Sequence, residues 1–287
     1  MTAVAMTRVA MTRVAMTRVR PGVLLAGLYL ILVVLAALIP GVLAPRNPLT
    51  ITSLPPFVRP FQTAQYILGT DQDGRDMLSR MIYGARPSLV MGLGATGIGV
   101  AGGAVLGLAA GLGGRVAETV IMRLIDIVLS IPDLLLALVV IALVGTGTID
   151  ALVAVGTAAI PGYARMIRAQ THVVRRAAYV ESATAMGIGR LTVLRRHLLP
   201  NAIKPVLVLA TIGVGTAIGY GASLSFLGLG TQPPTPEWGS MLANGIQFIN
   251  NDWVMVAVPG IAVTLTVLCV TVVGRDISAR AEGRASA

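Results

Sequence analysis

This sequence has little charge. Only 12% of its 287 residues are Asp, Glu, Lys or Arg, whereas 55% are hydrophobic and the mean hydropathy is +0.82. Such a composition leaves too little polar surface to cover a water-soluble globule, so we expect an integral membrane protein. Aromatic residues are also scarce, at 4%. Few side chains are therefore available to stack on bases, and the net charge of +10 does not by itself indicate nucleic-acid binding.

Reactive and metal-binding side chains are nearly absent. The single cysteine, Cys269, can form no internal disulfide, and His172 and His197 have no partners at the spacing of a metal site. The only lysine, Lys204, does not follow a glycine, so the Gly-Lys-Ser/Thr sequence that holds ATP phosphates is missing. The motifs of zinc proteases and serine hydrolases are missing too. We therefore predict no catalytic residue, no metal site and no cofactor in this chain.

Uncharged apolar stretches are abundant and predict an all-α protein with six transmembrane helices. The first would be about 33 Å long at ~1.5 Å per residue, enough to cross a bilayer. A cleaved signal peptide is the alternative for it, which Pro45 after Ala44 disfavours. The six stretches are residues 22–43, 89–112, 134–149, 151–164, 206–229 and 253–274.

Two of these spans are less regular than the others. The third is expected to begin near Glu118, to pair Arg123 with Asp126 along one face, and to kink at Pro132. The fourth is short unless it continues past Arg165. Lys and Arg are distributed unevenly among the connections. An arrangement with both termini in the cytoplasm places 17 of the 22 inside, so we predict that orientation.

The connection over residues 44–87 is rich in proline and is expected to be an exposed external loop. It includes a polar turn, which we interpret as solvated and hydrogen-bonded, since the later ligands of a calcium loop are missing. A short surface helix over 76–86 should follow, with Thr70 and Asp73 as a capping box. The residues of interest in this turn are Asp71, Gly74, Arg75 and Asp76.

Four glycines in the second predicted span lie four residues apart, at Gly99, Gly103, Gly107 and Gly111. This spacing puts them on one helix face, where small residues let another helix approach closely. Residues 92–97 match a dinucleotide-binding fingerprint in form, but no strand precedes them and they lie within an apolar run. We therefore predict a helix-packing face here and no cofactor site.

The segment 165–204 is long for a link between spans and contains eight basic residues. It breaks into two predicted short helices, 177–186 and 190–199, around Gly187, which is expected to have a positive φ. Pro200 is expected to stop the second helix.

Several motifs resemble one known family. Glu181-Ser182-Ala183, Gly187 and Leu199-Pro200 resemble the EAA loop of binding-protein-dependent ABC importer permeases, with His197 in place of the usual isoleucine and Ser182 in place of an alanine. Residues 68–76, 161–165, 196–201, 223–230 and 232–236 are similar to the C-type permease of dipeptide, oligopeptide and nickel importers. Residues 274–278 depart from the family's usual ending, and the pentad repeat at 5–19 has no counterpart in it.

This resemblance implies a function and a set of partners. The loop would be a coupling helix that docks on an ATPase subunit, and its residues would be Glu181, Ser182, Ala183, Gly187, Leu199, Pro200 and Asn201. A second, similar permease would complete a heterodimeric pore, two ATPase subunits or domains would hold ATP and magnesium, and an extracytoplasmic binding protein would deliver substrate. No nucleic acid is expected as a partner.

We therefore predict a multi-pass, non-catalytic permease of the cell membrane that imports di- or oligopeptides by alternating access. Its expected parts are a basic cytoplasmic tail (1–21), a first span with the external loop (22–87), a core of five spans (88–275) and a second cytoplasmic tail (276–287). Nickel or another small solute is the alternative cargo. A secondary transporter is a further alternative, for which Asp126 and Asp133 are the only acidic candidates in the spans. A membrane enzyme is disfavoured by the missing catalytic motifs.

Overall fold

The structure is a computed structural model that describes residues 21–52 and 55–281. The predicted basic repeats at 5–19 and the last six residues lie outside this part of the chain. The described residues form helices, together with two isolated β-bridges, Ile51 with Arg75 and Thr70 with Asp76. The helices are α1 (Pro21–Leu38), α2 (Pro40–Leu43), α3 (Met77–Leu112), α4 (Arg115–Leu129), α5 (Asp133–Val144), α6 (Thr148–Arg175), α7 (Ala178–Ala185), α8 (Arg190–Val193), the π-helix η1 (Leu194–Leu198), α9 (Leu199–Phe226), α10 (Trp238–Ile246) and α11 (Val254–Ala281).

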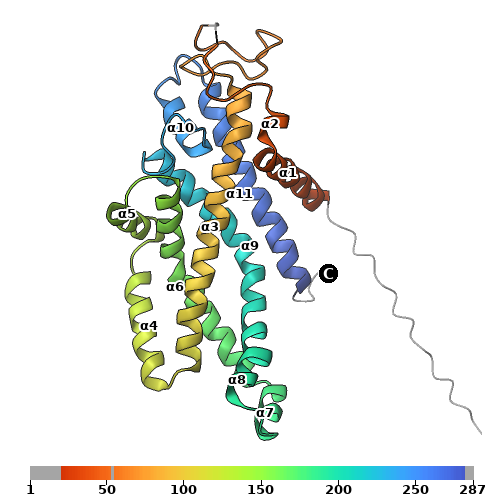
Figure 1. Cartoon of the computed structure of the whole chain (residues 1–287), viewed down its shortest axis with the longest axis vertical. Coiled ribbons are helices and arrows are strands. Elements are labelled where there is room, and N and C mark those ends of the chain that lie inside the picture. The colour runs from red at the N-terminus through yellow and green to blue at the C-terminus, as the bar shows by residue number, and fades with distance from the viewer. Residues whose placement is uncertain (1–20, 53–54, 282–287) are drawn as a thin grey trace, which may run out of the picture.

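The long helices form an elongated bundle with a different structure at each end (Figure 1). Helix α3 runs along most of the long axis. One end is covered by residues 44–52 and 55–76, which we call the loop cap, and by the short helix α10. The opposite end is formed by residues 176–201, which we call the α7–α8 lobe. The residues predicted to act outside the membrane and those predicted to act in the cytoplasm thus lie at opposite ends.

The described helices support a multi-spanning membrane protein but do not establish six spans. Four stretches are long and apolar enough to cross a bilayer, namely α1, α3, Leu191–Phe226 and α11. Helices α4 and α5 satisfy the same test only together, with a bend of 94° between them. Helix α6, the fourth predicted span, is not among the candidates. The count of six and the predicted orientation therefore stay predictions.

The predicted short helix over 76–86 is not a separate element. It forms the first turns of the 36-residue helix α3, which continues through Pro87. These turns are buried because Met77, Met81 and Ala85 pack against Trp238 of α10. The predicted capping box is also wrong, since Asp76 caps the helix by accepting the backbone N–H of Ser79 at 2.9 Å.

The region of the third and fourth spans differs from prediction in two ways. The chain bends by 94° between α4 and α5, near Pro132, which is more than the predicted kink. Helix α5 ends at Val144, so residue 149, the predicted end of the third span, belongs with residue 150 to the first turn of α6. The expected Arg123–Asp126 pair is replaced by an ion pair between Asp126 and Arg165, 2.5 Å apart. Helix α6 does continue past Arg165, to Arg175. Its charged half lies beside α4, where Asp126 is available as a partner.

Pro200 does not end the second helix of the lobe, which is a further correction. The chain passes from α8 through the π-turn η1 directly into α9, with Pro200 in the first turn of α9. The backbone N–H of Leu199 donates to the carbonyl of Leu194, five residues earlier. This wider turn removes the clash that a proline ring makes with the carbonyl four residues before it, so the helix can continue.

Candidate functional site

The predicted glycine face lies against α6. Gly99, Gly103, Gly107 and Gly111 are all buried on α3. A methyl group added to Gly103 would lie 2.5 Å from Cβ of Tyr163 and 2.9 Å from the backbone nitrogen of Ala164. One added to Gly107 would lie 2.6 Å from the carbonyl oxygen of Ala164. No larger residue fits without moving the backbone of α6, so these glycines set the close approach of the two helices.

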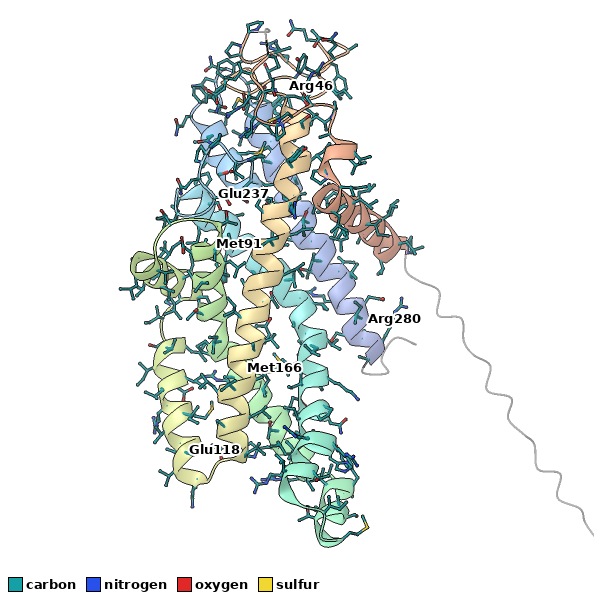
Figure 2. The ribbon with its side chains drawn as sticks, viewed as in Figure 1. Arg46, Met91, Glu118, Met166, Glu237 and Arg280 are labelled. Carbon is teal, nitrogen blue, oxygen red and sulfur yellow. The ribbon has the colours of Figure 1, made fainter. Side chains whose placement is uncertain are left out.

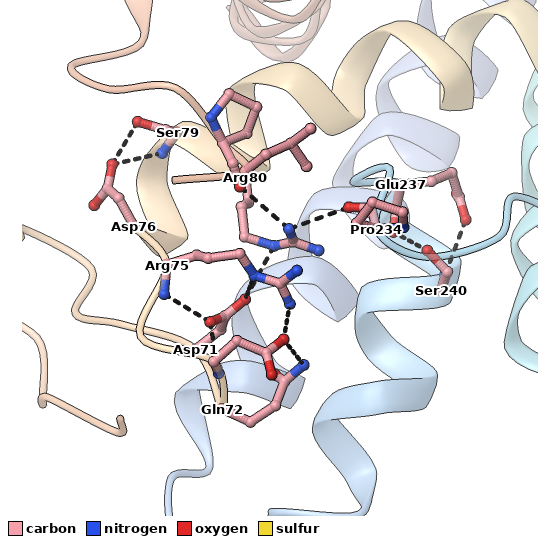
Figure 3. Close-up of polar contacts among 12 residues, drawn as sticks. Asp71, Gln72, Arg75, Asp76, Ser79, Arg80, Pro234, Glu237 and Ser240 are labelled. Carbon is pink, nitrogen blue, oxygen red and sulfur yellow. Dashed lines mark hydrogen bonds and ion pairs between the residues drawn. The ribbon is translucent and has the colours of Figure 1, made fainter. Parts of the chain in front are cut away.

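The polar turn of the loop cap is a buried ion network centred on Asp71 (Figure 3). One carboxylate oxygen, Oδ1, accepts the backbone N–H of Asp73 at 3.0 Å and that of Arg75 at 2.8 Å. The other, Oδ2, lies 2.8 Å from Nε of Arg75 and 3.2 Å from Nε of Arg80. Asp73 pairs with Arg75, and Gly74 closes the turn with a φ of +74°.

This network is hydrogen-bonded, as predicted, but its central residues are buried rather than solvated. Asp71 is 3% exposed and Asp76 1%, so the expected exposed turn is in fact part of the interior of the loop cap. Arg80 was not singled out from the sequence, yet it joins three segments. It contacts Asp71 and donates to the carbonyl oxygens of Pro48 at 3.3 Å and Pro234 at 3.4 Å. The polar turn therefore holds the loop cap together.

Helix α10 is fixed to the loop-cap end of α3 by a second buried carboxylate. Glu237 caps α10 by accepting the backbone N–H groups of Gly239 and Ser240, both at 2.9 Å. The hydroxyl of Ser88, on α3, donates to the same side chain at 3.0 Å. The indole N–H of Trp238 donates to the carbonyl of Met81 at 2.9 Å. These bonds tie the two helices over more than one turn.

The α7–α8 lobe turns at Gly187, whose φ of +78° is the left-handed conformation expected of a helix-ending glycine. The N–H of Gly187 donates to the carbonyl of Thr184 at 3.0 Å, and the N–H of Ile188 to that of Ala183 at 3.1 Å. This pair of bonds is a Schellman motif. Ile188 also packs against a small apolar core that includes Val180 and Ala183. The corner is therefore well defined although the lobe is small.

The predicted coupling residues divide into an outer and an inner group. Glu181 and Ser182 are exposed on α7, whereas Ala183 is 3% exposed and faces the core of the lobe. Leu199, Pro200 and Asn201 are half-buried where the lobe joins α9. There the side-chain amide of Asn201 donates to the carbonyl of His197 at 2.6 Å. The outer residues are accessible to a partner, while the inner ones hold the lobe on its helices.

Large apolar side chains are also exposed on the lobe. Met186 is 73% exposed, Leu191 62% and Tyr179 46%. Tyr179 belongs to α7 and Leu191 to α8, while Met186 directly precedes Gly187. Exposed apolar side chains in a segment that also exposes charged residues are typical of a protein-binding surface.

Helices α4 and α6 are joined by charged side chains toward the lobe end of the bundle (Figure 2). Glu118 of α4 accepts from Nε of Arg168 at 2.7 Å and lies 3.0 Å from Nε2 of His172, both on α6. Together with the Arg165–Asp126 pair, these contacts hold α4 alongside the half of α6 that leads into the lobe.

The sequence did not reveal a partly open cavity of about 320 Å³ lined by residues of α3, α5, α6 and α9, which we call the central cavity. Most of its lining is apolar, with hydroxyls from Thr96, Tyr163, Thr216 and Tyr220 and the carboxylate of Asp133. Met166, which also lines it, lies between Met91 and Glu118 along the bundle (Figure 2). A signal was present in the sequence, because Thr216 and Tyr220 are four residues apart within an apolar run.

Within residues 21–52 and 55–281, the structure places no three His, Cys, Asp or Glu side chains where they could hold a metal ion. The side chains at the ends and in the central cavity can form ion pairs, hydrogen bonds and apolar contacts. Such contacts suit the binding of a partner or ligand and the movement of helices relative to one another.

Known proteins resemble this chain in sequence and in fold. Residues 103–282 match the family described as the binding-protein-dependent transport system inner membrane component. The chain is 40% identical to a di/tripeptide transport system permease protein of Pseudomonas aeruginosa, over 86% of this chain and 83% of that protein. It is 39% identical to a probable D,D-dipeptide transport system permease protein of Escherichia coli, over 80% and 75% of the two chains. A chain of the inward-facing MetNI methionine ABC transporter has the same fold, with a TM-score of 0.57, 23% identity, and coverage of 71% of this chain and 97% of that one.

Proposed function

Because the chain belongs to the family of binding-protein-dependent transport system inner membrane components, we propose that it carries peptides across the membrane and is driven through its α7–α8 lobe. As a member of this family it is a multi-pass permease subunit of an ABC importer in the plasma membrane. Relatives named for di- and tripeptide transport support peptides as the cargo. The proposal assigns ATP hydrolysis to partner ATPases.

The continuity between the lobe and the helices of the central cavity carries the proposal. Helix α6 ends at Arg175, two residues before α7, and η1 continues into α9 without a break. Both α6 and α9 line the central cavity. A push on the lobe would therefore move two cavity walls as rigid bodies, which is how alternating access requires a distant ATPase to act.

The proposed orientation places the lobe and both termini in the cytoplasm. The excess of Lys and Arg on that side supports it. The loop cap then faces outward, where a substrate-binding protein would dock, and Phe61, 80% exposed, belongs to that surface. A second permease would supply the other wall of the pore.

Uptake by the reconstituted importer tests the cargo. The permease would be placed in vesicles with its partner permease, ATPases and binding protein, and supplied with labelled dipeptide or labelled nickel. We expect uptake of dipeptide that depends on ATP and on the binding protein. Uptake of nickel but not of dipeptide would show that nickel, the alternative cargo, is the transported solute.

Photo-cross-linking tests the coupling surface and the orientation together. In a Cys269→Ala background, a benzophenone attached at Met186→Cys should cross-link to an ATPase subunit. The same probe at Gln247→Cys, an exposed position at the loop-cap end, should not. Cross-linking of the ATPase from Gln247→Cys but not from Met186→Cys would show that the orientation is opposite to the proposed one.

A further inference from the structure

Among the described residues that line the central cavity, one side chain is charged at neutral pH, and it is acidic. Of the groups that line it, only Asp133 carries a charge, while no Lys or Arg lines it. Asp133 is the first residue of α5 and is exposed to the cavity side of the α4–α5 break. Ionisable groups within membrane-spanning segments are costly unless they face a polar or water-filled space, and they commonly mark a transport path.

The backbone around Asp133 supports a water-filled space. Residues 130–132 interrupt the helix where α4 and α5 bend by 94°. Non-helical backbone at membrane depth is tolerated only where protein covers it or where it lines a water-filled cavity. Asp133, directly after the break, lines the central cavity, so the break adjoins a space that can hold water.

A second observation is independent of the charge. The hydroxyl of Thr96 is buried, with the residue 7% exposed, and it has no hydrogen-bond partner among the residues that the structure describes, although it lines the cavity. Such a group is costly unless a ligand or water satisfies it. The hydroxyl of Tyr163 reaches the same place, because a methyl group added to Gly213 would lie only 2.0 Å from it and 3.8 Å from Cγ2 of Thr96. Gly213 thus leaves room for a hydroxyl beside the cavity.

We propose that the central cavity receives the ammonium end of a passing peptide, with Asp133 as its counter-charge and the hydroxyls of Thr96 and Tyr163 as hydrogen-bond partners. The inference rests on the proposed peptide transport. A peptide ammonium donates up to three hydrogen bonds, and one carboxylate with nearby hydroxyl oxygens can accept them. The apolar walls suit the adjoining side chain. The peptide's carboxylate finds no basic group here, so the partner permease or water must accommodate it.

Asp133 also has a structural explanation, since an acidic residue in the first turn of a helix interacts favourably with the helix dipole. The two roles can be separated by Asp133→Asn, which keeps a polar side chain at the start of α5 and removes the charge, and by Asp133→Glu, which keeps the charge. Asp133→Asn changes the electrostatic character of the cavity in either case, but a purely local role at the helix start would leave the protection of the cavity by dipeptide unchanged.

Charge-selective thiol labelling of the assembled importer measures that character directly. Thr216→Cys, in a Cys269→Ala background, would be labelled with methanethiosulfonate reagents of equal size that carry either a trimethylammonium or a sulfonate group. We expect the cationic reagent to react faster, and its advantage to fall about tenfold at low salt in Asp133→Asn, but not in Asp133→Glu. Gln247→Cys is the control, and its preference should be the same in all three backgrounds.

Two further results decide the proposal. With binding protein and ATP present, dipeptide should slow the labelling of Thr216→Cys. In a second experiment, free or N-acetylated dipeptide is added at high concentration to the detergent-solubilised importer. The N-acetylated dipeptide, which has no ammonium group, should then protect Thr216→Cys less than the free dipeptide. Equal rates for both reagents whether or not Asp133 is charged, or no labelling at all, would overturn the cation site. If the charge preference is present but the importer carries no peptide, the proposed cargo fails and the cation site stands.

Discussion

The two ends of the molecule use charged residues in opposite ways. At the loop-cap end, Asp71 of the loop cap and Arg80 of α3 are 3% and 4% exposed, and each contacts several partners. In the α7–α8 lobe, Glu181 is exposed and the apolar side chain of Met186 is 73% exposed. Both ends appear in the sequence as polar, glycine-containing segments, and yet one is a closed structural network and the other an open surface.

A polar motif therefore indicates a contact with a partner only if its side chains remain accessible. The bonds of Asp71 are already satisfied within the chain, so the loop cap can present only its outer residues to another protein. The lobe has a small core and a glycine corner that hold its outer residues in place. Variants at the two ends should therefore differ in kind, with loss of folding at the loop cap and loss of coupling at the lobe.

The largest effect is expected from Asp71→Ala. It leaves Arg75 and Arg80 buried without their shared carboxylate, and removing one partner from a buried ion network costs about 3–5 kcal/mol. We expect loss of the folded complex, measured by thermal unfolding of the purified permease. Asp73→Ala is the matched control, because the side chain of Asp73 is 46% exposed and its partners are Arg75 and the amide of Gln72, so its effect should be much smaller. Equal effects of the two would contradict the central role of Asp71.

The next largest effect is expected at the contact between α3 and α6, which connects the two ends of the bundle. Gly103→Leu should destabilise the fold by about 1–3 kcal/mol or more, because the added side chain would force α3 away from α6. Yield of the assembled complex and its thermal midpoint are the measurements. Gly97→Leu, on the same helix but with nothing within 4 Å of the added carbon, should be tolerated. If both variants assemble normally, the close approach of α3 and α6 is not required.

A smaller effect on stability but a large one on transport is expected from Gly187→Val. Its φ of +78° is strained for a β-branched residue by about 1–2 kcal/mol, although no atom lies where the new side chain would begin. The permease should still insert in the membrane, while substrate-stimulated ATP hydrolysis should fall strongly. Gly189→Val is the control, since Gly189 lacks both the positive φ and any close neighbour. Wild-type stimulation in Gly187→Val would show that the lobe is only a linker.

The smallest effect on folding is expected from Glu181→Lys. The side chain is exposed, so the free energy of unfolding should change by no more than about 0.5 kcal/mol. Reversing its charge should nevertheless weaken the association with the ATPases, measured as their co-purification with the permease at low and high salt. Lys204→Glu reverses an exposed charge outside α7 and serves as the comparison. Undiminished co-purification in Glu181→Lys would remove this residue from the proposed contact.

Long-range contacts explain where the sequence was a poor guide. Asp126 was expected to pair with Arg123, three residues away, but its partner is Arg165, which lies 39 residues along the chain. Pro200 was expected to end a helix because local rules say so, and the π-turn η1 lets α9 continue. The central cavity combines residues of four helices, each of which contributes only one or two polar side chains to it. No local pattern contains that combination.

Features that depend on short-range geometry could be predicted from the sequence. Apolar runs specified long helices, glycines four residues apart specified one close-packed face, and Gly187 specified a left-handed corner, since each follows from the backbone of a few consecutive residues. The burial of Asp71, the exposure of Glu181, and the position of Thr96 and Asp133 in the same cavity depend instead on how the helices pack. Burial and ion pairing depend on which distant segments come together, and the dielectric environment they create decides whether a charge stabilises the fold or remains available to a ligand.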